Sequence, residues 1–91
     1  METFTQSDLV YHYQWSEYQP DDPRVSGEPD STVFNRKEGW EVLFIINWLA
    51  AHLAWDVRSF GKKIELLIHD HLPEDLVRQD QAIQWIKENW K

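Results

Sequence analysis

The sequence predicts a mainly α-helical fold, a bundle of three to four helices around a central apolar helix at about residues 36–55. The central stretch is apolar except at Glu41, Asn47 and His52, and it is too long for one strand. Two later stretches repeat apolar residues at helical spacing, whereas the first third of the chain carries strand and loop signals. An N-terminal extended segment or small hairpin and an acidic loop therefore complete the predicted architecture.

The 91 residues predict a single domain, with an acidic extended and loop region at residues 1–34 and a helical core at residues 35–91. The chain has no cysteine, which excludes a disulfide framework, a thiolate metal site and a cysteine nucleophile. The first residues lack the basic and apolar pattern of a signal peptide, so we expect a cytoplasmic location.

Residues 9–15 alternate strand-favouring side chains with the period of a strand. We expect an extended segment here, paired with residues 31–34 or with a second copy of the chain, because a lone strand leaves its backbone groups unpaired. A helix capped by Ser7 or Asp8 is the alternative. The residues on one side of the predicted strand are Leu9, Tyr11, Tyr13 and Trp15.

Residues 17–30 form the predicted acidic loop, which is rich in proline, aspartate and other turn residues. Within it only Tyr18 and Val25 offer apolar surface. The loop is therefore either mobile or pinned by those two side chains.

The central helix has a start signal in Asn35, an N-cap residue, and Glu38 three positions later completes a capping box. Its side chains are apolar most of the way round, so we expect it to be buried on several sides. Gly39 in its first turn costs about 1 kcal/mol relative to alanine, which we attribute to close packing against a neighbour. The apolar run is shorter than the ~20 residues of a membrane span, so no membrane association is expected.

Two amphipathic helices are predicted after the central one. The first runs for about three turns from Phe60 and ends near Leu72, because Pro73 disfavours helical backbone before it. The second is capped by Asp80. Their apolar faces are Phe60, Ile64, Leu67, Ile68 and Leu72 in the first, and Ala82, Ile83, Trp85, Ile86 and Trp90 in the second.

The net charge of −7 is concentrated in the first third of the chain. Residues 1–34 carry seven acids against Arg24 alone, whereas residues 35–91 carry nine acids and eight bases. General binding to a phosphate backbone depends on clustered lysine and arginine, so nucleic acid is not the expected partner. An acidic region is suited to a basic protein partner, and it also keeps a small protein soluble.

Six tryptophans are an excess for a chain of this length, and tryptophan is favoured both in small cores and in binding surfaces. We expect Trp40, Trp48 and Trp85 in the core. The other three, Trp15, Trp55 and Trp90, lie at the ends of predicted elements and are the candidates for an exposed surface.

Metal binding and catalysis are not expected. His69 and His71 are two residues apart and point to different faces of a helix, and His52 and Asp56 have the right spacing but no third ligand. No nucleophile elbow or metalloprotease spacing occurs. The chain is therefore not expected to be an enzyme, and no cofactor is predicted.

The composition favours a small acidic protein–protein interaction module that forms a homodimer or binds a basic partner, in the sharpest version as an inhibitor or DNA mimic. A helical nucleic-acid-binding module using aromatic residues and the edge formed by Arg58, Lys62 and Lys63 is one alternative. A small-ligand pocket lined by Trp48, His52 and Trp55 is another. The candidate partner-binding residues are Trp15, Tyr18, Asp21, Asp22, Glu28, Asp30, Trp55 and Trp90.

Overall fold

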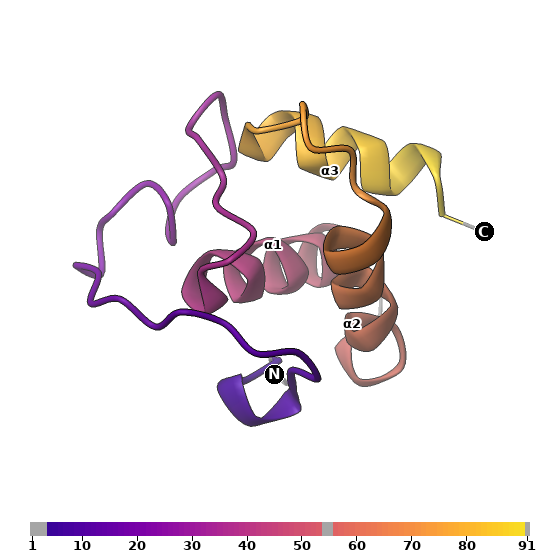
Figure 1. Ribbon diagram of the computed structural model, residues 1–91, viewed down its shortest axis with the longest axis horizontal. Coiled ribbons are helices and arrows are strands. Elements are labelled where there is room, and N and C mark those ends of the chain that lie inside the picture. Colours follow the sequence, from indigo (N-terminus) through magenta and orange to yellow (C-terminus); the bar gives the residue numbers. More distant parts are fainter. Residues whose placement is uncertain (1–3, 54–55, 91) are drawn as a thin grey trace.

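The computed structural model describes residues 4–53 and 56–90 and is mainly helical, with no strand in these two ranges. Its helices are α1 (Gly39–His52), α2 (Val57–Leu66) and α3 (Gln79–Glu88). A short 3-10 turn, η1 (Gln6–Asp8), precedes them, and a π-helical turn, η2 (Leu67–His71), continues α2. Figure 1 shows α1 in the middle, α2 and α3 beside it, and the N-terminal segment running past α1 before it loops around the start of that helix.

The hydrophobic core lies where α1, the α2–η2 unit and α3 meet. Ile45 and Leu49 of α1 are fully buried, as are Ile64 of α2 and Ile86 of α3. Burying one such side chain contributes about 1.5–3 kcal/mol relative to leaving it in water. The contacts among these aliphatic side chains therefore hold the three helices together.

The start of α1 differs from the predicted capping box. The helix begins at Gly39 rather than near residue 36, and no side chain caps it. Asn35 instead accepts a hydrogen bond from the backbone N–H of Lys37 at 2.9 Å, which forms a turn before the helix. The Glu38 carboxylate accepts hydrogen bonds from Ser16, so it is not available to the helix terminus.

The other two helices follow their predicted faces but not their predicted starts. α2 begins at Val57, before Phe60, and the helical backbone ends at His71, with Leu72 extended before Pro73 as expected. α3 follows Arg78 as its N-cap residue, so the prediction that Asp80 caps it is wrong. Asp80 lies in the first turn instead, where its charge favours the positive end of the helix.

The N-terminal segment is extended after η1, but its predicted pairing with residues 31–34 is wrong. Gln14 pairs in parallel with Glu38: its N–H donates to the carbonyl of Lys37 at 2.8 Å, and its carbonyl accepts from Gly39 at 2.9 Å. Residue 33 pairs with residue 78 in the antiparallel sense. Each extended segment thus pairs with the residues at the start of a helix. Gly39 and Gln79, the first residues of α1 and α3, donate to it the N–H groups that have no acceptor within their helices.

Arg36 closes the end of the α2–η2 unit. Its guanidinium donates to the carbonyl of Leu72 and, at 2.8 Å, to the carbonyl of Pro73. These carbonyls follow the last helical turn, where a positive charge is also favoured by the helix dipole.

We expect Arg36→Gln to lower the free energy of unfolding by about 2 kcal/mol, because charged hydrogen bonds to half-buried carbonyls are lost. Urea denaturation followed by circular dichroism measures this loss. The matched control is Lys37→Gln, which removes an exposed positive charge from the neighbouring position. Equal losses in the two variants would mean that charge, rather than this hydrogen bonding, is responsible.

Candidate functional site

Three buried glutamates hold the N-terminal segment against the helices. Glu38, Glu41 and Glu65 are only 6%, 2% and 0% exposed. Burying a carboxylate is costly unless hydrogen bonds replace its water. Each of the three accepts such bonds from residues 10–18, and none forms an ion pair with another residue in the described ranges.

Glu65 of α2 receives the most donors. Its carboxylate accepts the backbone N–H of Val10 at 3.0 Å and that of Tyr11 at 3.2 Å. The hydroxyl of Tyr13 donates to the same carboxylate at 2.7 Å. One buried side chain therefore satisfies two consecutive backbone N–H groups that the extended segment does not pair with another strand.

The other two glutamates act at the start of α1. Glu38 accepts the N–H of Ser16 at 3.2 Å and its hydroxyl at 2.9 Å. Glu41 accepts the hydroxyl of Tyr18 at 2.6 Å and the N–H of Asn35 at 3.0 Å. The segment that carries the predicted strand and the start of the acidic loop is thus fixed at successive points along the helical core.

Two aromatic rings of the N-terminal segment lie directly on glycines. A Cβ atom at Gly39 would come within 2.3 Å of the Trp15 ring, and one at Gly61 within 2.6 Å of the Phe4 ring. The side-chain amide of Asn47 accepts from the N–H of Phe4 at 2.7 Å and donates to its carbonyl at 3.0 Å. Gly39 therefore has the close-packing role expected from the sequence.

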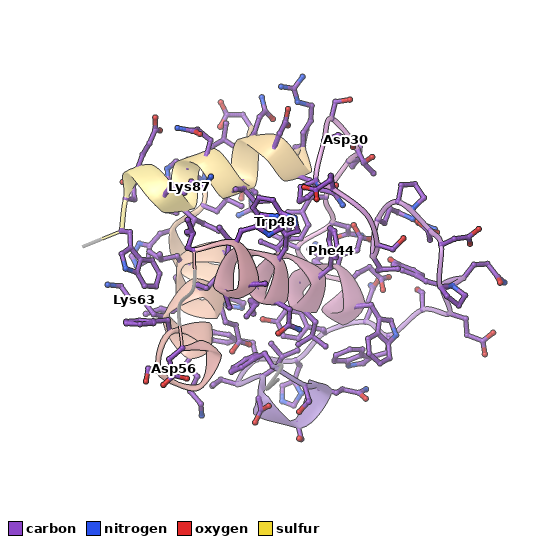
Figure 2. The ribbon with its side chains drawn as sticks, turned by 180° about the vertical axis from the view of Figure 1, so that it is seen from behind. Asp30, Phe44, Trp48, Asp56, Lys63 and Lys87 are labelled. Carbon is purple, nitrogen blue, oxygen red and sulfur yellow. The ribbon has the colours of Figure 1, made fainter. Side chains whose placement is uncertain are left out.

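A groove of about 1000 Å³ opens between this segment and α1. Its α1 wall includes Trp40 and Phe44, and Figure 2 labels Phe44 one turn before Trp48. Trp15 and Tyr18 of the N-terminal segment also line it, and the Trp15 ring contacts the Trp40 ring. No lysine or arginine is among the described residues that line it, which are Phe4, Thr5, Gln6, Trp15, Ser16, Glu17, Tyr18, Gln19, Pro20, Val25, Trp40, Leu43, Phe44 and Asn47.

Trp40 was expected in the core, and that prediction is wrong. The side chain is 39% exposed in the groove, and its ring meets the Trp15 ring nearly at a right angle, with the centroids 4.9 Å apart. Trp40 lies on the side of α1 that meets the N-terminal segment, whereas Val42 and Leu43 of the same turns are buried in the core. Trp48 and Trp85 are half-buried and pack against the core.

Part of the hydrogen-bonding capacity of the groove walls is used within the chain. Thr5, Ser16, Tyr18 and Asn47 already use their side chains in hydrogen bonds within the chain. The remaining polar side chains that line it are exposed, and they are Gln6, Glu17 and Gln19. An occupant would therefore contact mainly aromatic surface.

All three tyrosines of the sequence hydrogen-bond to carboxylates: Tyr11 to Asp70, Tyr13 to Glu65 and Tyr18 to Glu41. Burial raises the pKa of each phenol above its usual 10.0, and the neighbouring carboxylate raises it further. Because the folded-state pKa exceeds the unfolded one, this contribution to stability is complete below pH 10 and is lost as the pH rises above it.

We therefore expect no tyrosine to ionise with an ordinary pKa near 10.0 while the segment stays in place. Ultraviolet absorbance of tyrosinate should rise in one steep step together with loss of the native circular dichroism. In Tyr13→Phe, the free energy of unfolding should fall less steeply as the pH rises above 10 than it does in the unaltered protein. Gradual ionisation of all three tyrosines in a still folded chain would contradict the observed hydrogen bonding.

The predicted partner-binding residues do not form one surface. Trp15 and Tyr18 meet in the groove, and Val25, the other apolar residue of the loop, lines it too. Trp90 lies after the end of α3, where its ring contacts Phe60 and the Lys63 ammonium. The position of Trp55 lies outside the described residues.

The predicted acidic residues are partly used inside the loop. Arg24 donates three hydrogen bonds to Asp22, two from its guanidinium and one from its backbone N–H, and they hold the pKa of that carboxyl at about 2. Asp30 accepts from the N–H of Thr32 at 2.8 Å. Asp21 and Glu28 are exposed, and Glu28 lies 3.9 Å from the ring of His52.

Sequence reasoning missed the aromatic residues Phe4, Trp40 and Phe44 as parts of a site. It also missed the buried glutamates that position Trp15 and Tyr18. The one available signal was Glu41, a carboxylate within the longest apolar run of the chain. Such a residue must find donors when the run is buried.

The other features noted in the sequence form no comparable site. His69 stacks on Tyr11 and contacts Asp70 at 2.6 Å, and the described ranges contain no group of three or more potential metal ligands. Trp48 and His52 stack on each other with their ring centroids 3.8 Å apart, and neither lines the groove. No helix within residues 4–53 and 56–90 has the length and apolar character to cross a membrane.

Comparison with known protein families, with characterised proteins and with solved structures found no match for this chain.

Proposed function

We propose that this protein is a non-enzymatic interaction module whose groove binds a segment of another protein that carries apolar and positively charged side chains. The observation that supports this most directly is the lining of the groove. Five aromatic side chains come together there, and no basic residue lines it within the described ranges. Aromatic residues dominate binding energy at protein interfaces, and positive partners are attracted by a net charge of −7.

The position of the acidic residues supports a basic partner. Glu17 lies at the groove, and Asp21 and Glu28 are exposed on the loop that follows. Such charges raise the rate of encounter with a basic surface more than they raise final affinity. An inhibitor or DNA mimic would use these carboxylates against a protein that binds nucleic acid, and a cytoplasmic location belongs to the same proposal.

In this proposal α1 is the central helix of the bundle. Its buried face packs against α2 and α3, while Trp40 and Phe44 are left to line the groove. A homodimer is the competing use of the same aromatic surface, because a second copy would cover Trp40. Light scattering at two protein concentrations measures the solution mass. A dimer mass supports self-association through this surface, and a monomer mass at both concentrations leaves the groove free for another protein.

The experiment is a calorimetric titration with a synthetic peptide of alternating leucine and lysine, compared with its leucine and glutamate counterpart. We expect only the lysine peptide to bind, more weakly as salt is added, because surface charges are screened. Trp40→Ala should abolish binding, and Val77→Ala, an exposed apolar position outside the groove, should not. Equal binding of both peptides, or full binding to Trp40→Ala, would refute the proposal.

A further inference from the structure

We propose that the groove recognises an N-methylated lysine side chain of the partner, with its methylammonium group placed in the corner that the contacting rings of Trp15 and Trp40 form. This inference rests on the proposed function and adds the chemical group that anchors the partner segment. It is argued from the aromatic geometry, from the buried negative charge behind the groove and from the cost of removing water from an unmodified ammonium group.

The aromatic geometry is that of a cage for a cation. The rings of Trp15 and Trp40 stand at 81° to each other, so together they form a corner with two differently oriented walls. Phe44 and Tyr18 line the same groove. The face of an aromatic ring is electronegative and attracts organic cations, most strongly when the ring is tryptophan.

Two negative charges lie directly behind this lining. Ser16 and Tyr18 line the groove, and they donate hydrogen bonds to Glu38 at 2.9 Å and to Glu41 at 2.6 Å. No ion pair within the described ranges neutralises either glutamate. Charges in a poorly solvated region interact more strongly than charges in water, so a cation in the groove would gain from both.

A basic residue beside this site, Arg24, is already engaged. Arg24 lies over the Tyr18 ring at 4.4 Å and forms an ion pair with Asp22 at 2.7 Å. It therefore shows that a cation can rest on the aromatic surface at this end of the groove. It does not line the groove, and its charge is balanced by Asp22.

The walls favour a methylated ammonium over an unmodified one. A lysine ammonium brings three N–H donors, each of which needs an acceptor once water is removed. The rings of Trp15, Trp40 and Phe44, against which the ammonium group would lie, offer no such acceptor. Trimethylation removes the donors and keeps the charge, so the desolvation penalty falls while the attraction to the rings remains.

The test compares one lysine-containing peptide in three forms: with trimethyl-lysine, with lysine, and with the neutral tert-butyl isostere of trimethyl-lysine. We expect the trimethyl-lysine form to bind at least about tenfold more tightly than either of the others, the ratio that a cation–π interaction in a desolvated site provides. Calorimetry gives the affinities. The indole N–H signals of Trp15 and Trp40 in NMR spectra show where the peptide binds.

Substitutions of Trp40 and the free cation choline complete the test. Trp40→Phe should retain most of the preference, Trp40→Leu should remove it, and Val77→Ala should leave it unchanged. Equal binding of trimethyl-lysine and its neutral isostere would overturn this inference, and the leucine–lysine peptide would still test the proposed function separately. Choline binding as tightly as the peptide would overturn the assignment to a protein side chain.

Discussion

Replacing Glu65 with alanine is expected to lower the free energy of unfolding by about 3 kcal/mol, because it leaves three partly buried donors without their acceptor. The carboxylate is fully buried and binds the N–H groups of Val10 and Tyr11 together with the hydroxyl of Tyr13. No other described residue accepts a hydrogen bond from these two N–H groups. The N-terminal segment should therefore detach locally, while α2 itself gains helix propensity from the alanine.

Urea denaturation of Glu65→Ala measures the loss, and Glu74→Ala, at an exposed position, is the matched control. A double-mutant cycle with Tyr13→Phe isolates the hydroxyl–carboxylate bond, because the two changes should be strongly non-additive. Additive effects, or a loss in Glu65→Ala no larger than in the control, would show that this carboxylate does not hold the segment.

Gly39→Ala is expected to destabilise the protein by about 2 kcal/mol, although glycine-to-alanine changes in helices ordinarily stabilise by about 1 kcal/mol. The new methyl group would lie 2.3 Å from the Trp15 ring, which cannot stay where it is. The ring is tied by the pairing of Gln14 with the start of α1 and by the bonds of Ser16 to Glu38. Its displacement should therefore disturb the segment on both sides and reshape the groove.

Thermal denaturation together with tryptophan fluorescence measures this effect. In a Trp15→Ala background the clash is absent, so Gly39→Ala should become neutral or stabilising. Stabilisation of the otherwise unaltered protein by Gly39→Ala would contradict the close contact between the ring and the glycine.

The helices were predictable because burial on one face imposes a periodic pattern on the sequence. The spacing of Ile64, Ile68 and Leu72 predicts that these residues lie on one face of a helix. In the structure all three are buried in the core. Helix starts were less predictable. Asn35 and Asp80 are good capping residues by type, but their neighbours provide competing hydrogen bonds in the folded chain.

The groove was only partly predictable for a different physical reason. Trp15 and Tyr18 stand where the composition changes, which identified them as candidates. Trp40 belongs to the most apolar stretch, and a pattern of apolar residues does not reveal which of them a neighbouring segment leaves uncovered. Nor does it reveal a buried glutamate, since its donors come from residues up to 55 positions away in the chain.

The central claim is that the N-terminal segment packs on the helices and forms one wall of an aromatic groove. NMR spectroscopy tests it most directly through the α-protons of Gly39 and Gly61. The packing predicts cross-relaxation between these protons and the rings of Trp15 and Phe4, with chemical shifts displaced by the ring currents. Random-coil shifts without cross-relaxation to either ring would mean that the segment is not docked and that the groove does not exist.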